Sequence, residues 1–116
     1  MSTFIELKEN VLQWAKDKEI LTKATPLTQL AKTTEEVEET KEALFALANG
    51  LGTYRNSKGQ HKYTNNEVKD GFGDVLVTIL IGCELVGLDP LDCLQEAYNV
   101  ISKRTGKMVD GTFVKD

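Results

Sequence analysis

The chain from residue 64 to residue 86 reads TNNEVKDGFGDVLVTILIGCELV, and this stretch decides the predicted fold. From Val75 onward, apolar side chains cover almost the whole circumference of a helix, so we expect this helix to be buried. Asp70 and Asp74 share one face of the helix because they lie one turn apart. An isolated buried charge is very costly, so Asp74 is expected to have a partner.

Start and stop signals predict four helices in the chain, over about residues 3–21, 26–48, 65–86 and 90–104. Thr25 and Asp89 are expected N-caps, each followed by a proline at the first helical position. Thr64 is expected to cap the third helix, with Glu67 as its capping-box partner. Between the second and third helices, residues 50–64 contain glycines and basic side chains without periodicity. We expect a long loop there.

The fold class expected for residues 1–116 is all-α, a single domain resembling a four-helix bundle in which the long helices run antiparallel. The composition, 41% hydrophobic and 28% charged, is typical of a folded globular protein and argues against disorder. The tail over residues 107–116 contains an Asp-Gly pair between two short apolar pairs, which leaves a hairpin there open.

The charge pattern excludes two classes of partner. The net charge is −4 and no Lys/Arg-rich run occurs, so we expect neither polymeric nucleic acid nor an acidic membrane surface as partner. No apolar stretch reaches the roughly 18 residues of a membrane-spanning helix, and the N-terminus lacks a signal-peptide pattern, so a cytoplasmic protein is expected. A single nucleotide is compatible with the acidic chain if a metal ion accompanies it.

The second helix carries a glutamate-rich run, TTEEVEETKEA, over residues 33–43. Helical spacing predicts an apolar stripe formed by Leu30, Val37 and Leu44. Three glutamates point away from this stripe, namely Glu35, Glu38 and Glu42. The other polar residues form a line at its edge: Gln29, Lys32, Glu36 and Glu39. A solvated helix face is the usual interpretation of such a run, and it stays open here.

Antiparallel packing of the two long helices would bring Glu36 and Glu39 opposite Asp70 and Asp74. Carboxylate oxygens suit a hard divalent cation such as Mg²⁺, and the lack of Cys or His in this group argues against zinc. The alternative is a salt bridge of Asp74 with Lys32 or Lys103.

Gly71 and Gly73 flank Phe72 on the turn that carries both aspartates. Glycine inside a helix is costly, so the two glycines indicate a close approach of backbone or ligand at this turn.

These motifs resemble the MazG-like members of the all-α nucleoside triphosphate pyrophosphohydrolase superfamily, which carry EExxE on one helix and ExxD on the next. Residues 35–39, EEVEE, match the first motif in full. Aligning Gly73-Asp74-Val75 with the family's usual GDV places Gly71 where the Glu of ExxD belongs. Asp70 then supplies the missing ligand, as in phage-type and other minimal sequences of the family. The alternative register, Glu67 with Asp70, satisfies ExxD literally.

The resemblance, which extends from about Gln13 to Arg104, implies hydrolysis of a nucleoside triphosphate to monophosphate and pyrophosphate by water attack between the α and β phosphates. The implied Mg²⁺ ligands, with Mn²⁺ as an expected substitute, are Glu36, Glu39, Asp70 and Asp74. Glu35 and Glu36 are the implied catalytic residues. Glu35 would orient or deprotonate the water, or support the ligands from outside.

Positively charged and amide side chains are implied to contact the substrate, and Trp14 to line the base pocket beside Gln13. The other residues assigned to substrate binding are Gln29, Lys32, Asn99, Lys103 and Arg104. Each could instead be a solvated surface residue, and Trp14 a core residue. The family's assemblies also imply a homodimer or homotetramer. The alternative function is an inactive helical regulatory or interaction module with the same fold.

Overall fold

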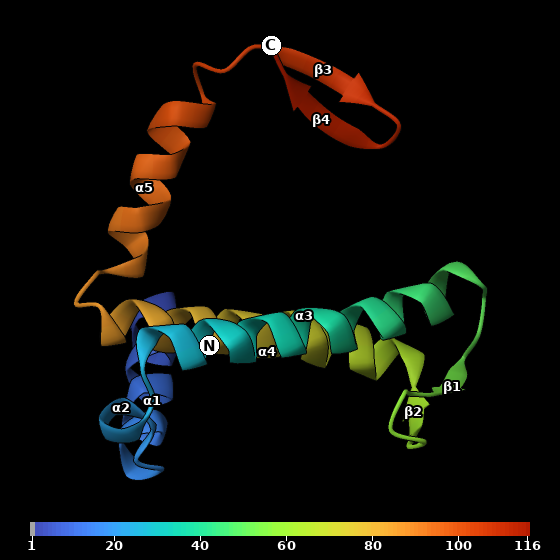
Figure 1. Ribbon diagram of the computed structural model, residues 1–116, viewed down its shortest axis with the longest axis horizontal. Coiled ribbons are helices and arrows are strands. Elements are labelled where there is room, and N and C mark those ends of the chain that lie inside the picture. The colour runs from blue at the N-terminus through green and yellow to red at the C-terminus, as the bar shows by residue number, and fades with distance from the viewer. Residues whose placement is uncertain (1) are drawn as a thin grey trace.

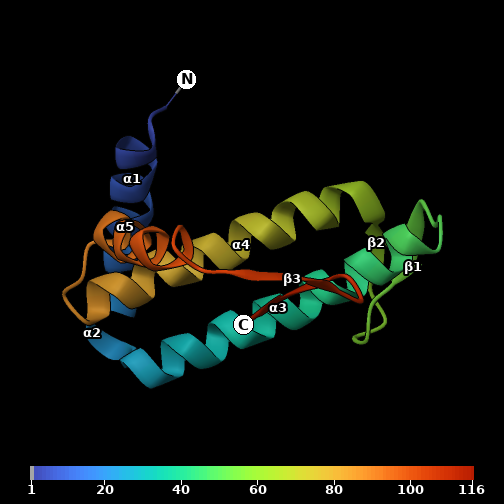
Figure 2. The same ribbon diagram turned by 90° about the horizontal axis from the view of Figure 1, so that it is seen from above.

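The computed structural model describes residues 2–116 and is mostly helical (Figure 1). The elements are α1 (Phe4–Asp17), α2 (Ile20–Lys23), α3 (Pro26–Ala48), β1 (Thr53–Arg55), β2 (His61–Tyr63), α4 (Thr64–Leu85), α5 (Pro90–Ile101), β3 (Gly106–Val109) and β4 (Thr112–Lys115). The long helices α3 and α4 lie side by side and antiparallel, with α1 against one end of α4 (Figure 2). The all-α expectation therefore holds for most of the chain, but two small hairpins depart from it.

Helix α3 matches its predicted bounds because its start signal is strong. The Thr25 hydroxyl accepts the backbone N–H of Thr28 at 3.1 Å, and the Thr28 hydroxyl accepts that of Thr25 at 2.9 Å. Pro26 occupies the first helical position, where its missing N–H costs nothing. The helix ends at Ala48, followed by Gly50 in the left-handed region, with φ 70°.

The first helix is shorter than predicted. It ends at Asp17, because Glu19 takes a left-handed φ of 65° that breaks the hydrogen-bond ladder before the short helix α2 begins at Ile20. Glycine is the residue that usually adopts this conformation, and residues with a Cβ seldom do. Because position 19 is a glutamate, the sequence does not mark the break. The continuous helix predicted over residues 3–21 is therefore wrong in its last turn.

The long loop predicted over residues 50–64 contains a β-hairpin. Strands β1 and β2 pair antiparallel, with Thr53 opposite Tyr63. The turn is built by Asn56, whose side-chain oxygen accepts the backbone N–H groups of Lys58 at 3.0 Å and Gln60 at 2.9 Å. Three-residue strands are too short to give a readable alternation, which is why the sequence predicts only a loop.

The capping box predicted for Thr64 is wrong. Thr64 is the first residue of α4 and Tyr63 is its N-cap, without a side-chain capping bond. The Thr64 N–H donates to Gly52 O at 3.0 Å, which ties the helix start to the hairpin. The side chain is buried, and within residues 2–116 its hydroxyl has no hydrogen-bond partner. Glu67 instead lies 3.7 Å from Lys62 Nζ.

The C-terminal part begins as predicted, because Asp89 accepts the N–H of Leu91 at 2.8 Å and caps α5. The helix ends at Ile101 instead of about 104. The tail then forms the β3–β4 hairpin around Asp110 and Gly111, whose φ values of 50° and 82° both lie in the left-handed region. Such values at both turn positions are typical of a two-residue type I′ hairpin, which Asp-Gly favours.

Helix α5 does not close a four-helix bundle within this chain. The axes of α4 and α5 are bent by 102°, and none of the α5 residues is buried. Figure 1 shows α5 and the β3–β4 hairpin projecting from the body formed by α1, α3 and α4. The bundle expectation is therefore corrected to an antiparallel α3/α4 pair with α1 beside it.

Within residues 2–116, no single helix is long and apolar enough to cross a membrane.

The apolar stripe expected to form the core of α3 faces solvent. Leu30, Val37 and Leu44 are 62%, 45% and 39% exposed, whereas the buried residues of α3 are Gln29, Thr40, Ala43 and Ala46. The expected burial of the apolar half of α4 is likewise only partly met, because Leu76 and Ile79 are exposed. Small and polar side chains of α3 thus face α4. Ile81 of α4 is buried, but many other large apolar side chains remain on the outside.

The surface of the single chain is correspondingly large. It exposes 8803 Å², whereas a folded monomer of 12.9 kDa exposes about 6,300 Å². The radius of gyration is 16.8 Å, against about 13.4 Å for a compact domain of this length. The chain alone therefore leaves roughly 2,500 Å² more surface in water than a self-contained fold does.

Candidate active site

The register of the α3/α4 pair is fixed by contacts between small and polar residues. The side-chain amide of Gln29 donates to Thr78 O at 3.2 Å, inside the interface. Farther along, Thr40 packs directly against Gly71, where an added Cβ would lie 3.0 Å from Thr40 Cβ and closer still to its hydroxyl. A close approach is thus present at Gly71, but the neighbour is the Thr40 side chain and not the predicted backbone or ligand. Gly73 has no neighbour within 4 Å of such a Cβ.

This register places Glu36 near Asp74, between the Gln29 and Thr40 contacts. The Glu36 side chain is only 12% exposed, and Lys32 Nζ lies 3.4 Å from one of its oxygens. Lys32 Nζ is also 3.4 Å from Glu35, which is half exposed. Burial, followed by the carboxylate of Glu39, raises the pKa of Glu36, and Lys32 only partly offsets this. Glu36 is therefore a carboxylate with too little positive charge around it.

Asp74 is solvent-exposed in this chain, contrary to the burial expected from its apolar neighbours. Partial desolvation, followed by the carboxylates of Asp70 and Glu39, still raises the pKa of Asp74. Neither salt bridge proposed for Asp74 forms: within residues 2–116, Lys32 pairs with Glu35 and Glu36, and Lys103 makes no ion pair. Like charges thus crowd around Asp74 as the antiparallel packing predicts.

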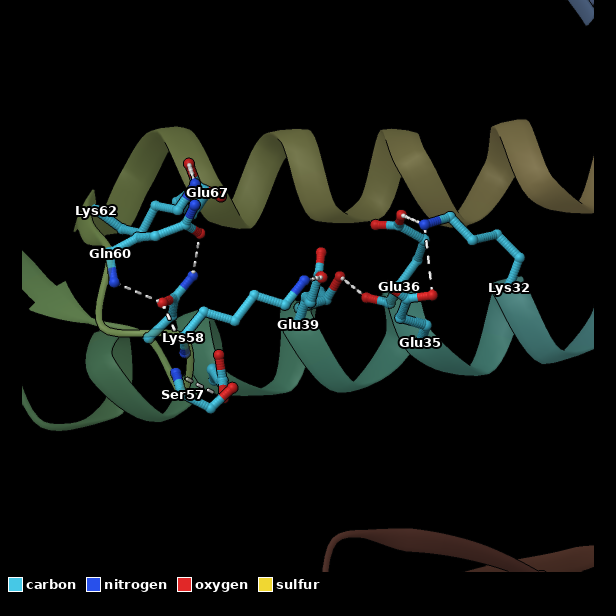
Figure 3. Close-up of polar contacts among 12 residues, drawn as sticks. Lys32, Glu35, Glu36, Glu39, Ser57, Lys58, Gln60, Lys62 and Glu67 are labelled. Carbon is cyan, nitrogen blue, oxygen red and sulfur yellow. Dashed lines mark hydrogen bonds and ion pairs between the residues drawn. The ribbon is translucent and has the colours of Figure 1, made fainter.

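Glu36 and Glu39 follow one another on α3, and we call them the acidic line. The β1–β2 hairpin lies beside the Glu39 end of this line (Figure 3). Lys58 Nζ lies 3.3 Å from Glu39 Oε1, and the Ser57 N–H donates to Glu42 Oε1 at 3.2 Å. The hairpin therefore reaches α3 through two neighbouring glutamates. Figure 3 shows Lys58 extending to Glu39 while Lys32 lies between Glu35 and Glu36.

A cavity of about 210 Å³ opens between α1, α2, α3 and α4 beside these carboxylates. It brings together residues assigned to the site from sequence, namely Trp14, Gln29, Lys32, Glu36 and Asp74. Trp14, Asp74 and Val77 also line an adjoining groove of about 360 Å³ between α1 and α4. Trp14 is 48% exposed, so it forms part of a wall and is not a core residue.

The cavity is also lined by four residues that sequence reasoning did not assign to it. They are Ile20, Val77, Thr78 and Ile81. Val77 and Ile81 lie three and seven residues after Asp74, so helical spacing gives a signal that would have found them. Ile20 carries no such signal, because its place depends on the break at Glu19.

The remaining residues assigned to substrate binding lie away from the cavity. Asn99 is on α5, where its side-chain oxygen accepts the amide of Gln95 at 3.0 Å, and Lys103 and Arg104 follow the end of α5. Because α5 projects from the body, this chain does not bring the three residues to its own acidic line. Gln13, beside Trp14, bonds Asp17 at 2.8 Å on the exposed face of α1.

The donor set suits a hard cation, since Glu36, Glu39, Asp70 and Asp74 offer only carboxylate oxygens. The raised pKa values of Glu36 and Asp74, each caused in part by neighbouring carboxylates, indicate a place where added positive charge is favourable. Within residues 2–116, however, no three of these side chains lie close enough together to hold a metal ion as they stand. The four carboxylates therefore suit Mg²⁺ in chemistry, but within residues 2–116 they are not gathered into a metal site.

Comparison with known proteins adds no identification. No protein-family model matches the chain, and neither the curated proteins nor the solved structures contain a match. The resemblance to MazG-like proteins therefore stays a prediction that depends on the motifs alone.

Proposed function

We propose that the chain is a Mg²⁺-dependent pyrophosphohydrolase that converts a nucleoside triphosphate to its monophosphate and pyrophosphate. The observation that supports this most directly is the 210 Å³ cavity, which combines an aromatic wall at Trp14, a cation at Lys32 and carboxylates at Glu36 and Asp74. An aromatic face suits a base, and a cation beside carboxylates suits a metal-bound phosphate chain.

The residues in and beside the cavity have different proposed roles, which follow from their contacts. Glu36 lines the cavity beside Lys32 and Asp74, and we assign it to the metal ion or to the proton of the attacking water. Glu35 does not line the cavity; it holds Lys32 from the solvent side. Gln29 keeps the wall in place, since its amide nitrogen is committed to Thr78 O. When bound, Mg²⁺ would neutralise phosphate charge and lower the pKa of water.

The surface of the chain supports a second copy as its partner. The excess of roughly 2,500 Å² over a self-contained monomer lies in the range that a subunit buries in an obligate dimer. The exposed side chains include Leu30 and Val37 on α3 and Leu94 and Tyr98 on α5. A homo-oligomer that covers these side chains would give the chain the apolar core that it lacks alone.

Pyrophosphate release from a panel of ribo- and deoxynucleoside triphosphates tests the activity, with Mg²⁺, Mn²⁺ or EDTA. We expect metal-dependent release that falls by at least about 100-fold in Glu36→Gln and Asp74→Asn. Glu38→Gln is the matched control, since Glu38 lies on the outward face of the same helix. Equal turnover in Glu36→Gln and Glu38→Gln would remove Glu36 from the mechanism, and absence of any turnover would contradict the enzyme.

The second candidate function is a helical interaction module without activity. It is favoured by the spread of the carboxylates, no three of which within residues 2–116 are close enough together for a metal ion. Binding of a nucleotide or metal separates the two candidates. The module predicts neither, whereas the enzyme requires both.

A further inference from the structure

Within residues 2–116, the ion pair of Lys58 with Glu39 is the one hydrogen bond or salt bridge that joins the hairpin to a carboxylate of the proposed metal site. Lys58 comes from the turn between β1 and β2, about twenty residues along the chain from Glu39, and its Nζ lies 3.3 Å from Glu39 Oε1. The side chains are 62% and 43% exposed, so the pair is weak and can open readily.

The backbone beside Lys58 is fixed, so the lysine does not reach Glu39 by chance. Asn56 accepts the Lys58 N–H at 3.0 Å, and the preceding Ser57 N–H donates to Glu42 at 3.2 Å. Glu42 lies three residues beyond Glu39 on α3, which is slightly less than one helical turn. The turn of the hairpin is thus attached to α3 beside the acidic line, and the flexible lysine stem extends from it toward Glu39 (Figure 3).

We propose that Lys58 occupies Glu39 in the metal-free protein and competes with the divalent cation for this carboxylate. The inference rests on the proposed function, because it takes Glu39 as a metal ligand. A carboxylate oxygen held by an ammonium group is unavailable in the geometry that a metal needs, and an ammonium nearby repels the cation. In the metal-free chain, Lys58 pairs with Glu39 and Lys32 pairs with Glu36.

Metal binding then couples to the hairpin. Once Glu39 turns to a cation, Lys58 loses its partner, and one of the two attachments of the turn to α3 is gone. The turn is expected to loosen when the site is loaded, with the ammonium group free for an anion. Arg55 and Lys62 are not displaced in this way, because Arg55 donates to Gly59 O and Lys62 pairs with Glu67.

Titration of Mn²⁺ into the full chain, without nucleotide, tests the competition by calorimetry or by the spin resonance of free Mn²⁺. We expect Lys58→Met to lower the Kd for Mn²⁺ about two- to fivefold, the effect of removing one exposed ion pair. Lys58→Arg keeps the charge and should restore the affinity of the parent. Lys62→Met is the matched control, because it removes the same charge from the same hairpin but pairs with Glu67.

Four results are possible, and each one supports or contradicts the inference. A tighter Kd in Lys58→Met alone, together with faster amide exchange at residues 56–58 of the parent on adding Mn²⁺, supports the competition. Equal tightening in Lys58→Met and Lys62→Met would mean a general charge effect and overturn it. If the parent binds Mn²⁺ but Lys58→Met binds it no tighter, this inference fails while the proposed function stands. If neither the parent nor any variant binds Mn²⁺, the proposed function fails first.

Discussion

At the scale of single residues, the contact of Gly71 with Thr40 sets how closely the two long helices approach. A methyl group at Gly71 would clash with Thr40, whereas one at Gly73 would meet no atom within 4 Å. We expect Gly71→Ala to lower the free energy of unfolding by about 1–3 kcal/mol, because the helices must move apart. Gly73→Ala should raise it by about 0.5–1 kcal/mol through helix propensity. Urea denaturation of both variants checks the prediction, and the same sign for both would refute the close contact.

The same contact concerns the position that the MazG-like resemblance aligns with the Glu of ExxD. A Glu at position 71 would point at Thr40 across the helix interface, so this backbone has no room for the side chain that ExxD requires. Asp74, one turn away, lies opposite Glu36 instead, and its pKa is raised in part by Asp70. Packing thus leaves no room for that Glu at position 71, and Asp70 is the candidate to replace its carboxylate.

The raised pKa of Glu36 makes a pH dependence of stability testable. Burial and Glu39 raise this pKa above the ordinary value of 4.5, so the folded protein binds the proton more tightly than the unfolded chain. The stability contributed by this group is therefore complete below the ordinary value and is lost as the pH rises through the folded pKa. Without divalent cations, we expect Glu36→Gln to be more stable than the parent near neutral pH, with a smaller difference in acid.

Urea denaturation across this pH range measures the Glu36 effect. Glu38→Gln, on the outward face of α3, is the control and should show a smaller change. Mg²⁺ should reverse the order by stabilising the parent and not the Gln variant. A parent that is more stable than Glu36→Gln throughout the range, with or without Mg²⁺, would show that the Lys32 pair outweighs the desolvation of Glu36.

How much of the site could be read from the sequence depends on which helix carries each residue. Spacing on α3 and α4 was enough to predict that Glu36 and Asp74 meet, because two long antiparallel helices allow few registers. The ion pair of Lys58 with Glu39 could not be predicted from the sequence, because the hairpin that brings them together has strands of only three residues. Asn99 lies away from the cavity of its own chain because α4 and α5 are bent by 102°, and this bend leaves no local signal in the sequence.

At the scale of elements, the sequence predicts both ends of α3 correctly, because its start and stop signals are complete. The N-cap of this helix can be tested. Thr25→Ala removes the hydroxyl that accepts the Thr28 N–H, and we expect a loss of about 1 kcal/mol in the free energy of unfolding. Thr34→Ala makes the same chemical change in mid-helix, where the Thr34 hydroxyl only bonds Leu30 O. There the better helix propensity of alanine should give a small gain. Thermal unfolding of the two variants should show opposite shifts, and matching losses would contradict the role of the cap.

The elements that escaped prediction share a cause. Helix α1 ends early because Glu19 adopts a left-handed φ of 65° without a glycine, and the β1–β2 hairpin depends on Asn56 for a turn that composition alone does not show. In neither place does hydrophobic periodicity mark the change of conformation. The β3–β4 hairpin is the opposite case, since Asp110-Gly111 carries its own turn signal.

At the scale of the whole molecule, the distribution of apolar surface leads to the last prediction. Leu91, Leu94, Tyr98 and Ile101 line one side of α5, which has no buried residue in the single chain. Burying such a stripe against a second copy would stabilise both copies at about 25 cal/mol per Å² of apolar area. We expect light scattering after gel filtration to give at least twice the mass of one chain.

The variant Leu94→Asp tests whether the α5 stripe forms this interface. A charge at its centre should shift the protein toward monomer and lower its thermal stability, because the uncovered chain has little core of its own. Val100→Asp is the matched control: Val100 is 55% exposed on the same helix but does not line the groove formed by the stripe. Dissociation by Leu94→Asp alone places the interface on the stripe, and dissociation by both variants would assign the effect to α5 stability instead. A parent that runs as a monomer at every concentration would mean that the exposed 8803 Å² belongs to the working form of the chain.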